Sequence, residues 1–315
     1  MAQGMNAGGL SDTAAVKEAM ARHGLVPVAW RPWSQLYRAA LAFCPRHVLP
    51  LLSGGSEQAM EPQHSAHSEL APHTVYGPVP SRRYGVTLGI NLLPLGDKHC
   101  TFRCTYCQLG PEKHHSAPHT FPDLATLARE VTVALLAQPA IDALVVSGNG
   151  EPTLHPQLEA ALALLAGLRD AHLPGRAIVV LTAGTELHRP DVRVALRHVD
   201  EVAVKLDAGT QAVFAQLDMP WQPLQLDTLT ESAAQLEGVA VQTILVRGRV
   251  DNTTEAEVAA WLARIRRIQP KRVDLYTLDR KPIDRALELV PLGVAESIAA
   301  QVRALGVPCR VFAGL

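Results

Sequence analysis

Three of the five cysteines, Cys100, Cys104 and Cys107, lie within eight residues in the pattern CxxxCxxC. An odd, clustered set of cysteines indicates metal binding rather than a framework of disulfides. Three thiolates can bind three irons of a [4Fe–4S] cluster, whereas a cluster that only transfers electrons normally takes four cysteines. The fourth iron would keep an open coordination position, where chemistry can take place. The spacing therefore favours a reactive iron–sulfur centre.

A structural zinc site is the alternative interpretation of these cysteines. Cys₃His zinc sites exist, and His114, His115 and His119 follow shortly after the cysteine cluster. Zinc clips usually combine a CxxC pair with a second, distant pair, and the sequence has no second pair. The remaining cysteines, Cys44 and Cys309, stand far apart and are expected to be small buried hydrophobic residues. Spacing and context favour the cluster and leave zinc as the runner-up.

A second motif, Gly148-Asn149-Gly150-Glu151, follows the next apolar run after the cysteines. Glycines allow the backbone to approach a ligand closely, and Glu151 supplies a carboxylate that can accept hydrogen bonds from an ammonium group. A turn of this composition is by itself more often a plain connection between a strand and a helix. Its position, one strand–helix unit after the cysteines, favours a ligand-binding role.

Polar residues also end the following two apolar runs. Thr182 begins a polar turn that could contact a cofactor, and Lys205 and Asp207 are two residues apart on the run after it. Residues two apart on a strand point to the same face, which is the inner face if the flanking valines pack outward. Charges inside a parallel strand are costly unless they are paired or liganded. A structural ion pair and a ligand-binding role both remain open.

Charged and polar residues near later strand ends are further candidates for contact with a substrate. They are Thr243, Arg247, Arg249, Asp279, Arg280 and Lys281. Arginine suits carboxylate or phosphate recognition because its planar guanidinium binds them bidentately, although such charges are often only solvated. Arg82 and Arg83 precede the first predicted strand, so simple barrel geometry places them at the end away from the chemistry, and their role is open.

The elements that must position these residues alternate regularly. The predicted strands are 86–94, 143–148, 177–182, 201–207, 239–247, 272–278 and 308–313. The predicted helices are 124–136, 157–168, 224–236, 255–268 and 295–305. Strand–helix alternation predicts an α/β fold with a parallel sheet and helices outside it. Six such units and a last strand predict a partial (β/α)6 TIM-like barrel with an additional C-terminal strand, whose chemistry lies at the carboxyl ends of the strands.

The first 75 residues differ from this pattern. Short helices are predicted at 11–23 and 33–42, and residues 53–73 have the Ser, Gly, Pro, Gln and His content of a linker. We therefore predict an N-terminal helical extension with its linker over residues 1–75 and a core domain over residues 76–315. The extension could be a lid, a partner-binding segment or a loosely docked arm.

Composition and charge describe an ordinary globular chain of 315 residues with a formal net charge of -1 and a pI near 6.9. No global basic field attracts it to nucleic acid, although a local basic patch would suffice, so a nucleic acid partner is possible but not favoured. The N-terminus lacks the features of a signal peptide, and no apolar run approaches the ~18 residues that a spanning helix needs. These features predict a cytoplasmic protein without a membrane partner.

CxxxCxxC with an aromatic residue, Tyr106, before the last cysteine resembles the signature of the radical S-adenosylmethionine superfamily. The resemblance implies a [4Fe–4S] cluster whose open iron binds the amino and carboxylate groups of S-adenosylmethionine. An electron from the reduced cluster then cleaves the sulfonium to methionine and a 5′-deoxyadenosyl radical, which abstracts hydrogen from a substrate. Gly150 and Glu151 stand where the family has its "GGE" motif, which holds the methionyl amine, and Asn149 replaces the first glycine of that triplet.

Three further stretches narrow the resemblance. Residues 77–83, 88–91 and 107–110 resemble a group of iron–sulfur oxidoreductases related to the wyosine-forming tRNA enzymes, over about residues 76–314. The archaeal-type wyosine enzymes carry a second cluster on an N-terminal cysteine set that this sequence lacks. The resemblance thus implies a single-cluster radical enzyme whose substrate is a small molecule or peptide somewhat more than tRNA. It also implies a flavodoxin- or ferredoxin-like external electron donor. The runner-up is a zinc-stabilised α/β barrel that acts as a non-redox binding module.

Overall fold

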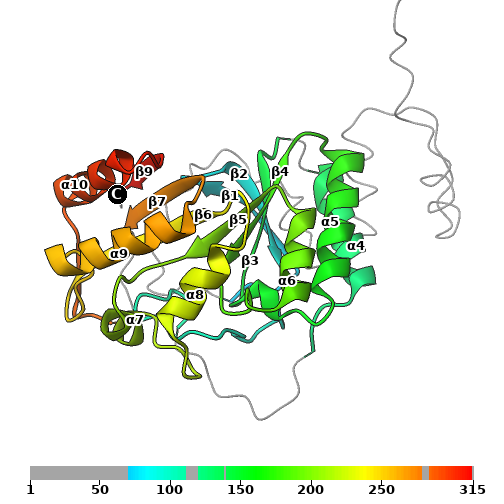
Figure 1. Cartoon of the computed structure of the whole chain (residues 1–315). Helices are drawn as coiled ribbons and strands as arrows, with labels where there is room; N and C mark the ends of the chain where they lie inside the picture. Colours follow the sequence, from blue (N-terminus) through cyan, green and yellow to red (C-terminus); the bar gives the residue numbers. More distant parts are fainter. Residues whose placement is uncertain (1–69, 111–119, 138–139, 279–283, 314–315) are drawn as a thin grey trace, which may run out of the picture. The chain divides into compact units, whose positions relative to one another are not determined.

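The computed structural model describes residues 70–110, 120–137, 140–278 and 284–313, and strands and helices alternate along them (Figure 1). The strands are β1 (Val75–Ser81), β2 (Gly85–Asn91), β3 (Ala143–Ser147), β4 (Ala177–Thr182), β5 (Glu201–Lys205), β6 (Ala240–Gly248), β7 (Arg272–Thr277), β8 (Leu287–Leu289) and β9 (Cys309–Phe312). The helices are α4 (Leu124–Ala137), η1 (Pro152–Leu154), α5 (Leu158–His172), α6 (Pro190–Ala195), η2 (Leu196–His198), α7 (Gln211–Leu217), α8 (Leu226–Ala233), α9 (Glu255–Ile268) and α10 (Leu292–Ala304). None of the helices in these segments is long and apolar enough to span a bilayer.

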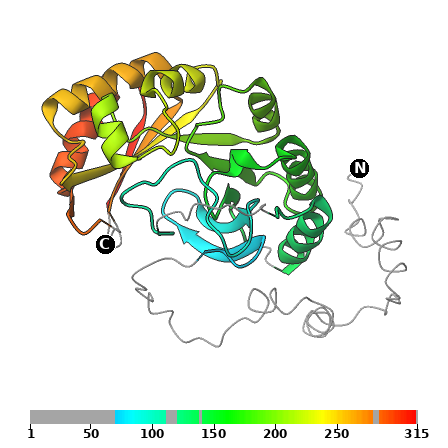
Figure 2. The same cartoon turned by 90° about the horizontal axis from the view of Figure 1, so that it is seen from below.

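The strands form one curved sheet in the order β1-β2-β3-β4-β5-β6-β7-β9, with β8 paired to β6. Strands β2 to β7 and β9 run parallel, and β1 is an antiparallel edge strand on β2. Both views place α4, α5 and α6 beside one another along the green strands, and α9 and α10 beside one another along the orange and red ones (Figures 1 and 2). This is the predicted α/β half barrel: six strand–helix units from β2 to α10, followed by β9.

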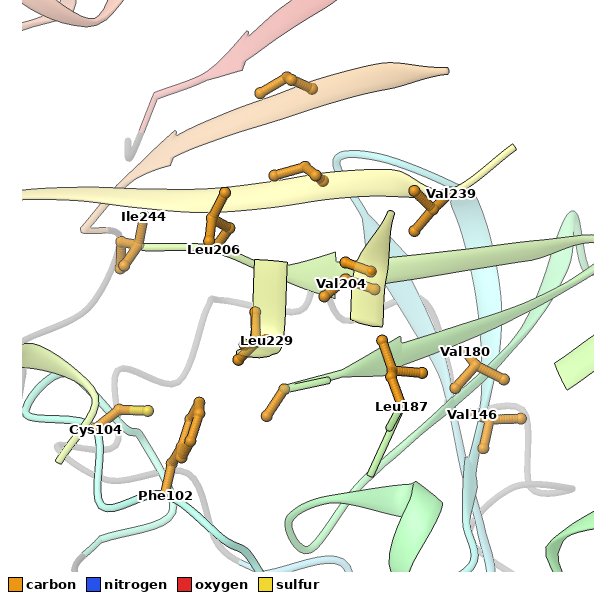
Figure 3. Packing of buried hydrophobic residues seen from close by; sticks show 14 of the residues in the cluster. Phe102, Cys104, Val146, Val180, Leu187, Val204, Leu206, Leu229, Val239 and Ile244 are labelled. Atoms are coloured by element: carbon orange, nitrogen blue, oxygen red, sulfur yellow. The ribbon is translucent and has the colours of Figure 1, made fainter. Parts of the chain in front are cut away.

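Alternation along the strands explains the helical layer. Val146, Val180 and Val204, on three successive strands, are fully buried in the hydrophobic core, and Figure 3 shows them with Leu187 and Leu229. Because side chains on a strand alternate between faces, their neighbours in sequence point to the concave face of the sheet. Burying one such side chain fully contributes about 1.5–3 kcal/mol, so the helix-facing residues fix the register of every strand.

The structure adds elements that the sequence patterns did not predict. Strand β1 was not predicted. Prolines such as Pro78 and Pro80 argue against a central strand, and they are tolerated here because β1 lies at the sheet edge. The short elements β8, α6 and α7 were also missed. The predicted helices at 11–23 and 33–42 and the linker at 53–73 lie outside the described residues, and the domain division at residue 75 stays a prediction.

Candidate active site

The cysteine loop follows β2, at the carboxyl ends of the parallel strands, as predicted. One side of the loop forms a parallel bridge with the GxGE segment, in which His99 N donates to Asn149 O at 2.8 Å and Glu151 N donates to His99 O at 2.9 Å. The other side contacts the carboxyl end of α7, where Thr105 N donates to Leu217 O at 2.9 Å. The backbone alone therefore holds the cysteines between two loops from distant parts of the chain.

Gly150 is required for this bridge. Its φ is +144°, and a Cβ at this position would lie 1.9 Å from the His99 carbonyl oxygen and 3.0 Å from the Cβ of Cys100. Only glycine allows so close an approach of the two backbones. The bridge places the next residue, Glu151, beside the first cysteine, and the Glu151 charge contributes to raising the pKa of the Cys100 thiol.

The three cysteines lie close together: Cys104 is buried, whereas Cys100 and Cys107 are half-buried. Burial raises the pKa of Cys100 to about 12 and that of Cys104 well above its usual range; Cys107 adds to both shifts, and Cys100 adds to that of Cys104. Thiolates at these positions therefore need a cationic partner, which suits an iron–sulfur cluster. Within the described segments no three Cys, His, Asp or Glu side chains gather around a single ion. A cube does not require this, because each thiolate binds a different iron.

Glu151 is held by hydrogen bonds on one side and less occupied on the other. Its Oε1 accepts from Thr153 N at 3.0 Å, from Thr153 Oγ1 at 2.5 Å and from Thr182 Oγ1 at 2.7 Å. Among the residues that the structure describes, its Oε2 accepts from Ala183 N alone, at 2.5 Å. Burial raises the pKa of this carboxyl group, although these hydrogen bonds oppose the shift. Oε2 thus keeps acceptor capacity for a cationic group, and Thr182 positions Glu151 from β4.

Asn149, predicted as a cofactor-binding residue, directs its side chain elsewhere. Its Nδ2 donates to Ala71 O and Pro94 O, both at 3.0 Å, and its Oδ1 accepts from Ala71 N at 2.7 Å. The side chain is fully buried and ties the segment before β1 to the loop after β2. Gly148, with φ +111°, sits where a Cβ would meet the Asn91 side chain at 2.5 Å. Both residues support the loop rather than offer side-chain atoms to a ligand.

Tyr106, Lys205 and Asp207 meet in one buried group, which we call the upper cluster. Lys205 Nζ donates to the Tyr106 hydroxyl at 2.9 Å, lies 3.5 Å from Asp207 Oδ2 and stands 4.8 Å from the centre of the tyrosine ring. The Tyr106 hydroxyl also contacts Asp207 Oδ2. Burial lowers the pKa of Lys205, but Asp207 and other nearby groups more than offset this and hold it well above its usual range. The ion pair predicted as one alternative is present.

Asp218 completes the upper cluster and was missed by the sequence analysis. Its Oδ1 lies 3.4 Å from Cys104 Sγ and 3.0 Å from the Tyr106 hydroxyl. Burial, reinforced by the Asp207 charge, raises the pKa of Asp218 to about 8. Asp218 caps the carboxyl end of α7, where an acid opposes the helix dipole. That unfavourable placement was the available signal, but it becomes visible only once α7 is known.

A cleft of about 440 Å³, within the size range of small-molecule sites, opens beside Cys100. Its lining includes His99, Cys100, Thr101, Thr185, His188 and Trp221. Thr101 Oγ1 and Thr185 Oγ1 are 2.9 Å apart across it. None of the eight predicted cofactor-binding residues lines this cleft, so it adjoins the predicted site rather than coinciding with it.

The remaining candidates stand apart from the cysteines or outside the described residues. Thr243 Oγ1 donates to Leu206 O at 2.7 Å, Arg247 Nε donates to Thr253 Oγ1 at 2.9 Å, and Arg249 pairs with Asp284. Cys309 is buried, in agreement with its predicted structural role. Outside the described residues lie Cys44, His114, His115, His119, Asp279, Arg280 and Lys281.

Comparisons with known proteins place this geometry in a family. A model of the Radical SAM superfamily matches residues 98–221, which include the three cysteines, Glu151 and Asp218. A UPF0026 protein of Helicobacter pylori (strain ATCC 700392 / 26695) is 32% identical over 225 residues, covering 69% of this chain and 70% of the relative.

Solved structures share the fold. A radical SAM methyltransferase from Sphaerobacter thermophilus aligns with a TM-score of 0.54 and 16% identity, covering 95% of this chain and 92% of that chain. A structure of TYW1 with a lysine-pyruvate adduct bound aligns with a TM-score of 0.50 and 10% identity, covering 69% of this chain and 73% of that chain. Likeness at such identities shows the fold alone, so the predicted relationship to wyosine-forming enzymes stays a prediction. The chain belongs to the UPF0026 family and is an enzyme of the radical SAM superfamily.

Proposed function

We propose that Cys100, Cys104 and Cys107 hold a single [4Fe–4S] cluster and that S-adenosylmethionine binds beside it, with its ammonium group on Glu151 Oε2. When bound, these groups would supply reductive cleavage of the sulfonium by one electron from an external donor, giving methionine and a 5′-deoxyadenosyl radical able to abstract a hydrogen atom from the substrate. The observation that carries the proposal is the backbone bridge between His99 and Gly150, which sets a buried carboxylate beside the first of three clustered thiols.

The protein's own groups position the cofactor and exclude water. Thr153 and Thr182 orient Glu151 by donating to its Oε1, which leaves Oε2 for the ammonium. Phe102 closes the outer side of the cysteine loop by packing edge-to-face on Phe214, with ring centres 5.5 Å apart. Such a dry, fixed environment is what a protein contributes when the cofactor performs the difficult chemistry.

Tyr106 and the other residues of the upper cluster form the base of the proposed cofactor site. The Tyr106 side chain is held by Lys205, Asp207 and Asp218, so the backbone between Cys104 and Cys107 cannot rotate freely. We propose that Gly148 and Asn149 contribute to the cofactor site through the loop backbone that they stabilise. Lys205 and Asp207 contribute a charged surface below the proposed cofactor site.

The proposed electron source is an external donor of the flavodoxin or ferredoxin type. For the substrate, the near-neutral charge supports a small molecule or peptide over tRNA. Purification of the protein would distinguish these substrate classes, because co-purified RNA with an absorbance maximum near 260 nm would support tRNA instead. Membership of the radical SAM superfamily favours this enzyme over the zinc-stabilised binding module.

The test is anaerobic reconstitution with iron and sulfide, followed by dithionite and S-adenosylmethionine, with 5′-deoxyadenosine as the product measured. We expect about four irons per chain and product formation in the wild type. Cys104→Ala should lose both, whereas the matched control Cys309→Ala, which removes a buried thiol far from the loop in sequence, should keep both. Stoichiometric zinc with neither cluster nor product in the wild type would contradict the proposal.

A further inference from the structure

The turn between β1 and β2, residues 82–84, reaches three other strands or their ends. Arg82 Nη1 donates to the Ala313 carbonyl after β9 at 2.5 Å, and Arg83 Nη1 donates to Gln242 Oε1 on β6 at 2.5 Å. The Tyr84 hydroxyl donates to Glu201 on β5 at 2.7 Å. The turn thus extends across the half barrel from the amino-terminal parts of β5 and β6 to the segment after β9; we call it the floor turn.

The concave face of the sheet above the floor turn is polar. Val204, Val241 and Val273 belong to the helix-facing core, so Lys205 and Gln242, the next residues on their strands, face the concave side. In the register of the sheet, Lys205 on β5 lies beside Gln242 on β6, and Gln242 lies beside Asp274 on β7. A single level of the concave face therefore presents a lysine, an amide and a carboxylate.

Cations near this face mostly have carboxylate partners. Arg272 bonds to both Glu201 and Asp274. Arg310 bonds to Asp274 at 2.8 Å, and Lys205 lies 3.5 Å from Asp207. These pairs are what the cost of burying an isolated charge demands.

Arg83 is different from these cations. Its guanidinium contacts the neutral Gln242 amide and the faces of Tyr84 and Tyr276, at 5.5 and 5.6 Å from the ring centres. No carboxylate among the described residues lies within ion-pair distance of it. Gln242 is itself oriented, because its Nε2 donates to Ala203 O at 3.2 Å, so its Oε1 faces Arg83. The amide and the rings position the guanidinium without neutralising it.

Within the described part of the chain, Gln242 takes one of the five guanidinium N–H donors of Arg83, and the other four have no hydrogen-bond acceptor. A fixed, half-buried guanidinium of this kind recognises an oxyanion, because its fork matches the two oxygens of a carboxylate or phosphate. Gln242 is level with Asp274 on β7, and Tyr276 lies two residues, about 7 Å, further along that strand on the same face. Lys205, with 18% of its side chain exposed, continues the path to Tyr106 and the cysteines.

We propose that Arg83 binds an oxyanion of the substrate, a carboxylate or a phosphate, and so anchors the substrate on the concave face below the cysteines. The proposal rests on the proposed function for the identity of this ligand as a substrate. Anion binding itself needs neither cluster nor S-adenosylmethionine, so its failure can be distinguished from failure of the radical chemistry.

The test uses the full-length, cluster-free chain and isothermal titration with two probes, inorganic phosphate and acetate, at constant ionic strength. We expect saturable binding of at least one probe to the wild type and to Arg82→Met, the adjacent arginine that serves as matched control. Arg83→Met should weaken binding about tenfold or more, the effect of losing charge-assisted hydrogen bonds. Tighter binding of phosphate or of acetate identifies which oxyanion the site prefers.

Gln242→Glu keeps the proposal testable if Arg83→Met folds poorly. It would give Arg83 a carboxylate partner, so anion binding should also fall about tenfold or more, although the bond to Ala203 is lost. If Arg83 only ties the floor turn to β6, anion binding should be unchanged in Gln242→Glu. Equal binding by the wild type, Arg83→Met and Gln242→Glu, or no saturable binding of either probe by the wild type, would overturn the proposal.

Discussion

Each end of the half barrel has a tyrosine hydroxyl in contact with a cation and with one carboxylate (Tyr84, at the floor) or two (Tyr106, in the upper cluster), and the charge balance differs. In the upper cluster, Lys205 faces both Asp207 and Asp218, and burial raises the pKa of Asp218 to about 8. At the floor, Arg272 and Lys271 surround Glu201. Burial there would raise the pKa of Glu201, but hydrogen bonds from Arg272, Tyr84 and Lys271 lower it to about 2.

The opposite shifts indicate different roles. A carboxylate with a lowered pKa has its charge satisfied and serves stability, whereas a buried acid with a raised pKa is typical of functional sites. The floor is therefore a structural clamp, next to which Arg83 has no carboxylate within ion-pair distance among the described residues. In the upper cluster, the raised pKa keeps Asp218 largely protonated near neutral pH, so the charged pair is Lys205 and Asp207.

The largest effect is expected from breaking the floor. Arg272→Met removes the cation that Glu201 and Asp274 share and leaves Lys271 and Arg310 as their partners, so the loss should reach at most about 3–5 kcal/mol, the cost of breaking a buried pair. Urea denaturation would measure the loss. The control Arg267→Met removes an exposed ion pair with Glu231 and should leave the urea midpoint nearly unchanged, because solvent screens such pairs. Equal losses in the two variants would contradict the structural role of the floor.

The next effect concerns the bridge that builds the upper end. Gly150→Ala adds a Cβ 1.9 Å from the His99 carbonyl oxygen, so the loops must separate, and we expect bound iron to fall well below the wild-type value. The strained backbone alone costs about 1–3 kcal/mol. Gly175→Ala shares a positive φ of +81° but has open space around its Cβ, so it should keep its iron. Iron and sulfide analysis after reconstitution distinguishes the two.

Acid should weaken the floor in a defined pH range. The folded-state pKa of Glu201 lies below its ordinary value of 4.5, at about 2, so its contribution to stability is complete above about pH 4.5. That contribution is lost as the pH falls from 4.5 through 2, because the unfolded chain takes up the proton first. Urea midpoints across this range should fall less steeply in Glu201→Gln. If the urea midpoints of the wild type and Glu201→Gln fell equally steeply with pH, Glu201 would not be the source of this acid sensitivity.

The smallest effect is expected at Asp218. Asp218→Asn keeps an oxygen that can accept from Tyr106 and removes a carboxyl group whose ionisation burial disfavours. The free energy of unfolding of the cluster-free protein should change by less than about 1 kcal/mol, whereas Glu201→Gln should lose about 1–3 kcal/mol. A larger loss in Asp218→Asn would show that the upper cluster also serves mainly stability.

Much of the fold and part of the site follow from local patterns. The alternating apolar runs predicted the parallel half barrel, and CxxxCxxC and Glu151 were found because their spacing is local. Asp218 could not be found in this way, since its contacts to Cys104 and Tyr106 depend on how the chain folds back after α7. The inward orientation of Arg83 likewise depends on β1, an edge strand whose prolines argue against a strand when only the sequence is known.

The two hydrogen bonds between His99 and the Gly150 segment also have a thermodynamic consequence. They join the loop of the three cysteines to the loop of Glu151, so neither loop can become ordered without favouring order in the other. Iron loading and S-adenosylmethionine binding therefore share a coupling free energy through this bridge. By reciprocity, each should tighten the other by the same factor.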